Sequence, residues 1–170
     1  TFGDLNADGY PDLYVSNYFG NSPNGVSIFN EQTITDNFLS AKDFLFINVG
    51  GTQFFEASEL YGMDHNGFGF QGVLTDWDND SDSDILIAND FGYKAQPNVA
   101  LTNEYPERAL TYDSQKLRLN YGMNAMGIAV GDVNFDGYMD YYVTNIHASL
   151  FTRNDQGISF TDAGAELGIT

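Results

Sequence analysis

The sequence of 170 residues contains no cysteine, and it has only six lysine or arginine residues against 24 aspartate or glutamate residues. Without cysteine, the chain can form neither a disulfide nor a thiolate metal site. The net charge of −18 disfavours binding to nucleic acid or to an anionic membrane, because like charges repel. No apolar run approaches the ~20 residues that a membrane-spanning helix needs. Because 42% of the residues are apolar, the chain can still bury a core.

The acidic residues gather in one short motif that occurs three times. The three stretches are GDLNADGYPD at 3–12, TDWDNDSDSD at 75–84 and GDVNFDGYMD at 131–140. Counted from the first aspartate of each stretch, oxygen-bearing side chains recur at positions 1, 3, 5 and 9. Two unit charges ~4 Å apart repel by ~4 kcal/mol at an effective dielectric constant of ~20. Such crowding is explained if a cation lies at the centre of each loop.

Each acidic stretch stands at the same place in a longer repeat. An apolar strand that ends in asparagine follows it directly, as DLYVSN, DILIAN and DYYVTN. Strands of small residues precede the second and third copies, and hairpins follow all three. The unit is therefore strand, acidic loop, strand, strand, turn, strand. This order predicts an all-β fold of four-stranded antiparallel sheets, each the size of a propeller blade.

The repeats predict blade units at 1–66, 67–122 and 123–170. The first unit carries a polar, turn-rich insertion at 20–42. It is expected to lack its leading strand, since only two residues precede its Gly3. The chain then holds about two and a half blades, a partial propeller, whereas closed propellers have typically 4–8.

A partial ring would leave apolar blade faces open to water. We therefore expect a piece of a longer propeller, or one of several chains that complete it. The faces around Leu13 and Val15 and around Tyr141 and Val143 are expected to be covered by neighbouring protein.

The spacing of the acidic positions suits a hard cation. Calcium takes 6–8 oxygen ligands, and every second side chain of a curled loop points inward, with a backbone carbonyl from position 7. Magnesium resists cages made only of protein oxygens, so calcium is favoured. A single copy could be an ordinary Asp/Asn-Gly turn, but three copies disfavour that reading. An EF-hand is excluded, because its glutamate at position 12 is replaced by Val15, Ile87 and Val143.

The motif and the hairpin pattern LFxNxGxxF resemble the FG-GAP or VCBS-type repeat, which builds β-propellers such as those of the integrin α-chain head and the cartilage acidic protein group. NDFG at 89–92 and FTDAGAELGI at 160–169 are similar to repeats of the latter group. The resemblance implies that each loop binds calcium, about three ions in all. The implied ligands of the first site are Asp4, Asn6, Asp8, Asp12 and the carbonyl of Tyr10. Those of the second are Asp76, Asp78, Asp80, Asp84 and the carbonyl of Asp82. Those of the third are Asp132, Asn134, Asp136, Asp140 and the carbonyl of Tyr138.

One residue departs from the pattern. Ser81 stands where the other two loops have Gly9 and Gly137. A residue other than glycine in a left-handed bend costs of order 1 kcal/mol. The second loop is therefore expected to be the strained one.

Other features are interpreted as structural. GFGFQG at 67–72 matches the dinucleotide fingerprint, but an acidic loop follows it rather than a helix, so its glycines are assigned to a strand. His65 and His147 belong to separate units and are expected at the surface. None of the proposed ligand sets has a catalytic base or nucleophile beside it. The calcium is therefore expected to be structural, and the chain is not expected to be an enzyme.

The resemblance implies an extracellular, cell-surface or periplasmic module for adhesion, assembly or protein recognition. Its expected partners are other protein chains or further blades of the same protein, with carbohydrate as a further candidate. The alternative is a propeller that serves as scaffold or accessory part of a polysaccharide lyase or hydrolase. Basic residues within 92–120 could then meet an acidic ligand.

Overall fold

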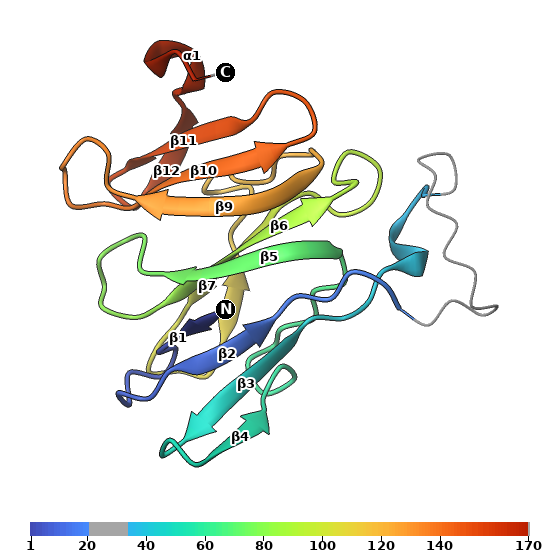
Figure 1. Ribbon diagram of the computed structural model, residues 1–170. Coiled ribbons are helices and arrows are strands. Elements are labelled where there is room, and N and C mark those ends of the chain that lie inside the picture. The colour runs from blue at the N-terminus through green and yellow to red at the C-terminus, as the bar shows by residue number, and fades with distance from the viewer. Residues whose placement is uncertain (21–33, 170) are drawn as a thin grey trace.

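The computed structural model describes residues 1–20 and 34–169. Within these residues the chain forms three four-stranded antiparallel sheets, which follow one another through the molecule (Figure 1). Helical structure in the described part is limited to the 3₁₀ turn η1 (Asn37–Leu39) and the short helix α1 (Gly164–Leu167). The expected all-β architecture of partial propeller blades is thus confirmed.

Each sheet is formed by four strands that are consecutive in the sequence. The first sheet contains β1 (Phe2–Gly3), β2 (Asp12–Val15), β3 (Phe44–Val49) and β4 (Gln53–Glu56). The second contains β5 (Phe68–Thr75), β6 (Asp84–Asp90), β7 (Val99–Asn103) and β8 (Leu110–Tyr112). The third contains β9 (Ala125–Gly131), β10 (Asp140–Asn145), β11 (Leu150–Asp155) and β12 (Ser159–Asp162).

The first sheet differs from expectation at its beginning. Its leading strand is present as the two-residue β1, in which Phe2 lies opposite Leu13 and Gly3 opposite Asp12. The prediction that this strand is missing is therefore wrong, because two residues suffice for a short ladder. Of the predicted insertion at 20–42, residues 21–33 lie outside the described residues, and the described remainder contains η1.

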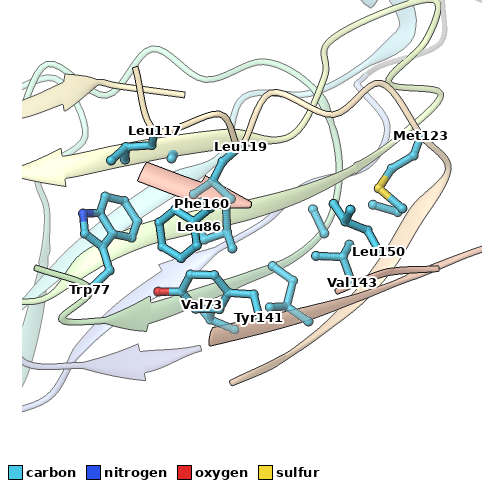
Figure 2. Close-up of a cluster of buried hydrophobic side chains, with 14 residues drawn as sticks. Val73, Trp77, Leu86, Leu117, Leu119, Met123, Tyr141, Val143, Leu150 and Phe160 are labelled. Carbon is cyan, nitrogen blue, oxygen red and sulfur yellow. The ribbon is translucent and has the colours of Figure 1, made fainter. Parts of the chain in front are cut away.

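Two apolar cores lie between neighbouring sheets. The core between the first and second sheets contains Leu5, Tyr14, Leu45, Ile85 and Ile87. Trp77, Leu86, Tyr141 and Phe160 are among the residues of the core between the second and third sheets (Figure 2). Every residue of β6 is buried, since this strand has a neighbouring sheet on both faces. That position explains why the sequence DILIAND is apolar on both faces.

The expected exposure of the third sheet's face is corrected by the structure. Tyr141 and Val143 are only 0% and 3% exposed, because they already pack in the core shared with the second sheet. The open face of the third sheet is the opposite one, which Tyr142 faces because side chains alternate along a strand. Leu13 and Val15 of the first sheet are, as expected, only partly buried within this chain.

Gly69 and Gly72 of GFGFQG lie in β5, as the sequence predicts, and Gly67 directly precedes the strand. Gly72 lies against the aromatic ring of Tyr14, so a Cβ atom at this position would meet Tyr14 Cε1 at 2.2 Å. The glycine allows the first and second sheets to approach each other closely. Its role is packing and not phosphate binding.

Candidate metal centres

The three acidic motifs form the connections β1–β2, β5–β6 and β9–β10, here called loop 1 (4–12), loop 2 (76–84) and loop 3 (132–140). All three lie along one side of the molecule, at the left of Figure 1. Each sheet thus presents one loop at the same place, as the repeat predicts.

The three loops share one backbone course. Positions 4 and 6 are left-handed in each loop. The φ angles at position 4 are 53° for Ala7, 63° for Asn79 and 60° for Phe135. Those at position 6 are 85° for Gly9, 78° for Ser81 and 91° for Gly137. The predicted left-handed bend at Ser81 is therefore confirmed, and the serine takes it without the freedom of glycine.

The aspartate at position 1 curls each loop by accepting backbone N–H groups. In loop 1, Asp4 accepts from the amides of Asp8 at 3.2 Å and Gly9 at 2.9 Å. In loop 3, Asp132 accepts from the amides at the same two positions at 3.1 and 2.9 Å. In loop 2, Asp76 accepts from Asn79 at 2.7 Å and from Ser81 at 3.1 Å. The same carboxylate thus bonds the backbone at the middle of all three loops.

The aspartate at position 9 is buried and connects its loop to the third strand of the sheet. Asp12, Asp84 and Asp140 are 0%, 1% and 1% exposed. One oxygen of each accepts from the amide at position 2: Leu5 at 2.8 Å, Trp77 at 3.2 Å and Val133 at 3.0 Å. The other oxygen accepts from the backbone N–H of an asparagine in the third strand: Asn48 at 2.8 Å, Asn103 at 2.9 Å and Asn154 at 2.8 Å. A carboxylate oxygen has two lone pairs, so these bonds leave each aspartate able to coordinate a cation.

Loop 2 gathers its carboxylates most closely. One oxygen from each of Asp76, Asp78 and Asp84 lies within 4.8 Å of the other two. Asp78 Oδ1 and Asp82 Oδ1 are buried and accept no hydrogen bond from the described residues. A buried carboxylate oxygen without a partner is costly unless a cation or a proton reaches it. The residues present in loop 2 therefore fit a hard, oxygen-seeking cation.

Burial also changes the acidity of loop 2. Desolvation, aided by repulsion from neighbouring aspartates, raises the pKa of Asp78. The same causes raise the pKa of Asp82 to about 7. Burial raises the pKa of Asp84 to about 8, although two backbone amides oppose the shift. Without a cation, Asp82 and Asp84 would hold protons near neutral pH, and a divalent cation would displace them.

Loops 1 and 3 differ from loop 2 at position 3, which is asparagine. Asn6 Nδ2 donates to Asp8 at 3.0 Å, and Asn134 Nδ2 donates to Asp136 at 2.8 Å. In the part of the chain that the structure describes, neither loop brings three carboxylates as close together as loop 2 does. Asp80, at position 5 of loop 2, accepts from the amide of Asp82 at 3.2 Å. The expected carbonyl ligands at Tyr10, Asp82 and Tyr138 remain a prediction.

Three buried asparagines in the hairpins, Asn48, Asn103 and Asn154, were not recognised as functional from the sequence alone. Two of them bond to the loop of another sheet. Asn103 Nδ2 donates to the carbonyl of Leu5 at 2.7 Å, and Asn154 Nδ2 donates to the carbonyl of Trp77 at 2.8 Å. Each bond joins one sheet to the loop of the preceding sheet. The signal was the asparagine repeated in LFINVG, VALTNE and LFTRND, at the same place in every hairpin.

His65 is the second residue that the sequence misplaced. It is 3% exposed, so the expectation of a surface position is wrong, whereas His147 is exposed as expected. His65 Nδ1 lies 2.5 Å from the buried carboxylate of Asp43, and its Nε2 lies 3.0 Å from Asn89 Nδ2. Because Asn89 Nδ2 is a donor, Nε2 must accept, and Nδ1 donates to Asp43. The histidine thus connects the first sheet to β6 of the second.

Three sheets of one repeat, each with an acidic loop between its first two strands, define a protein of the β-propeller repeat class. Residues 76–143 match the family model of the FG-GAP-like repeat, and residues 1–29 match that of the FG-GAP repeat. The two matches together cover more than half of the chain, which is therefore an FG-GAP-type repeat protein. No curated protein matches the chain. Among the described residues, no helix has the length and apolar character needed to span a membrane.

Proposed function

We propose that this chain is a calcium-stabilised, extracellular β-propeller module that serves protein recognition. Each of loops 1, 2 and 3 would hold one calcium ion with the side chains at positions 1, 3, 5 and 9 and the carbonyl at position 7. The observation that carries the proposal is loop 2. There, one oxygen from each of Asp76, Asp78 and Asp84 lies within 4.8 Å of the other two, and Asp78 Oδ1 is buried and accepts no hydrogen bond from the residues that the structure describes.

Calcium at these loops would be structural. Nearly half of the 24 acidic residues lie in the three loops, on a chain of net charge −18. A bound divalent ion offsets the repulsion within each loop, and binding to the folded state alone stabilises that state. The buried aspartates at position 9 would transmit this stabilisation, because each also bonds the third strand of its sheet.

A binding role, rather than a catalytic one, is supported by the surroundings of the titratable groups. His65 is enclosed between two sheets and bonded to Asp43 and Asn89, so no substrate can reach it. His147 lies beyond β10 in the third sheet, away from the acidic loops. In each loop, the aspartates at positions 1 and 9 accept hydrogen bonds from backbone amides. An extracellular location is supported by the repeat family, and free calcium is abundant outside cells.

The proposal is tested by titrating calcium into chelator-stripped protein in an isothermal titration calorimeter. We expect heat from calcium binding and little from magnesium at the same concentration, because magnesium resists all-protein oxygen cages. Asp78→Asn should weaken binding at one site by about tenfold or more, since it removes a charge from the centre of loop 2. Asp155→Asn, an exposed aspartate outside the loops, is the matched control and should bind as the wild type does. Absence of calcium binding would overturn the proposal.

A further inference from the structure

A hollow of about 360 Å³ lies at the end of the second sheet opposite loop 2. It is lined by the connection between β6 and β7, the beginning of β7, the end of β8 and the connection between β8 and β9. Loop 2 leads into the beginning of β6, whereas the β6–β7 connection follows the end of that strand. The volume is within the range of ~300–1,000 Å³ that is typical of small-molecule sites.

The lining of the hollow is polar but uncharged. Of the eight described residues that line it, none is acidic or basic, on a chain with 24 acidic and six basic residues. Four of them carry side-chain amides, namely Gln96, Asn98, Gln115 and Asn120. An amide has two donor hydrogens and an acceptor oxygen. The hollow therefore suits a neutral ligand with many groups that both donate and accept.

Asn98 is the fixed polar group of this hollow. The residue is only 3% exposed, its backbone N–H donates to the carbonyl of Tyr121 at 3.1 Å, and its Oδ1 accepts from the backbone N–H of Asn89 at 3.0 Å. Within the described part of the chain, no group accepts a hydrogen bond from Asn98 Nδ2. A buried donor without an acceptor is costly. Because Asn98 lines the hollow, its Nδ2 is placed to donate to whatever fills it.

The equivalent position in the first sheet is Asp43, which is satisfied internally. Its backbone N–H donates to the carbonyl of His65 at 3.2 Å, and its Oδ1 accepts from the backbone N–H of Asn17 at 2.6 Å, as in Asn98. The other carboxylate oxygen accepts from the Tyr14 hydroxyl and from His65 Nδ1. The first sheet therefore uses both side-chain atoms inside the protein. The donor that Asn98 presents is thus particular to the second sheet and not a general property of the repeat.

Tyr112 adds an aromatic wall to the hollow. Its side chain is 46% exposed, and its hydroxyl accepts from the backbone N–H of Asp64 at 3.0 Å, which holds the ring in place. A tyrosine held in this way presents a flat apolar surface beside its polar tip. The C–H groups on one face of a sugar ring pack against such a surface, while the hydroxyl groups at the ring edge bond to amides.

We propose that this hollow binds a neutral saccharide. Asn98 Nδ2 and the amides of Gln115 and Asn120 bond to the sugar hydroxyls, and the ring of Tyr112 stacks on the sugar ring. The uncharged lining favours a neutral sugar over a uronate or a sulfated sugar, and the net charge of −18 repels such anions further. The site lies at the other end of the sheet from loop 2, so it adds a ligand class that does not rest on the calcium proposal.

Saturation-transfer NMR of the whole chain in calcium tests the proposal. The probes are methyl glycosides of neutral hexoses, deoxyhexoses and N-acetylhexosamines, with methyl glucuronide as the acidic probe and an uncharged glycine–serine peptide as the protein-like probe. We expect a signal from at least one neutral glycoside, with a dissociation constant in the millimolar range typical of so small a ligand. The glucuronide and the peptide should give none.

Variants of the lining identify the site. Tyr112→Ala should abolish the signal, whereas Tyr112→Phe loses the same bond from Asp64 but keeps the ring and should retain sugar binding. Asn98→Asp keeps the acceptor oxygen and removes the donor, so it should weaken binding by about tenfold. If Asn98→Asp lowers the melting temperature, Gln115→Ala replaces it, because that side chain is exposed. Gln53→Ala, at an exposed position outside the hollow, is the matched control and should bind as the wild type does.

The outcomes separate this proposal from that of the calcium sites. Calcium titrated into Gln115→Ala should give the same heat as the wild type, because the hollow and loop 2 lie at opposite ends of the sheet. Silence of every neutral glycoside, a stronger signal from the glucuronide or from the peptide, or equal sugar binding by Tyr112→Ala and the wild type would each overturn the saccharide site. None of these results would alter the measured calcium binding.

Discussion

In loop 2, Ser81 has a backbone conformation that favours glycine. Its φ of 78° lies in the left-handed region, where the equivalent positions have Gly9 and Gly137. Ser81→Gly should raise the free energy of unfolding in calcium by up to ~1 kcal/mol, since glycine takes this conformation without steric cost. Chemical denaturation at fixed calcium concentration measures the change.

Ser83→Gly is the matched control, because this serine is two residues away and has no left-handed φ. It should not raise stability, as glycine there only adds freedom to the unfolded chain. A loss of stability in Ser81→Gly would show that the serine hydroxyl matters more to loop 2 than the backbone strain.

The buried carboxyl groups of loop 2 predict how stability depends on pH without calcium. Burial raises the pKa of Asp82 to about 7 and that of Asp84 to about 8, from ~3.9 in the unfolded chain. Between pH ~4 and ~8 the folded chain therefore holds protons that the unfolded chain has released. The free energy of unfolding in chelator should accordingly fall as the pH rises through this window.

Differential scanning calorimetry in chelator at pH 5 and pH 8.5 measures this effect. The melting temperature should be lower at pH 8.5, and calcium should reduce the difference because it replaces the protons. Asp82→Asn, which keeps the backbone carbonyl, should lessen the fall. A melting temperature that rises with pH in chelator would contradict the assignment of these groups as buried and uncompensated.

At the scale of single elements, β5 contains the closest approach between two sheets. Gly72→Ala would place a Cβ atom 2.2 Å from Tyr14 Cε1, and the buried ring has little room to move. The variant should lose about 1–3 kcal/mol of stability, the usual cost of overpacking a core. Urea unfolding measures the loss.

Gly131→Ala is the control for this substitution, because it lies in the equivalent leading strand β9. A Cβ atom there would meet no atom within 4 Å, and the residue has no left-handed φ. The control should keep near wild-type stability. Equal losses in both variants would show that strand glycines matter here for backbone reasons and not for the approach of Tyr14.

The strand order of each sheet could be predicted from the sequence because it depends on local patterns. The acidic loop, the apolar strand and the Gly50-Gly51 turn each act within a few residues, and β3 and β4 lie on either side of that turn. The short β1 was missed, because a two-residue strand has no periodicity to recognise. The conformation of Ser81 could be predicted because the two homologous loops have glycine at this position.

Contacts between sheets could not be predicted, since they depend on how the repeats stack. Tyr141 was expected on an open face, yet it is buried, because strand alternation does not say which face meets the neighbour. His65 was expected at the surface because the residues that enclose it could not be recognised: its partners Asp43 and Asn89 are distant in sequence. The role of Asn103 likewise depends on a carbonyl in the preceding sheet.

At the scale of the whole molecule, the acidic loops and the sheet contacts form one system. Loop 1 is bonded to the second sheet through Leu5 and Asn103, and loop 2 to the third through Trp77 and Asn154. Asn79 Nδ2 in loop 2 also donates to the carbonyl of Gly137 in loop 3 at 3.1 Å. Loss of order in one loop would therefore loosen the docking of its neighbour. Calcium bound at the loops would stabilise the stack of sheets as a whole.

The most direct test of this account is the thermal unfolding of the whole chain, first in chelator and then after calcium is restored. The account predicts a lower melting temperature in chelator and its recovery with calcium. Unfolding should be a single cooperative transition, because hydrogen bonds connect each loop to the next sheet. Magnesium at the same concentration should restore little of the loss. A melting curve that is identical in chelator and in calcium would contradict the claim that these loops are structural calcium sites.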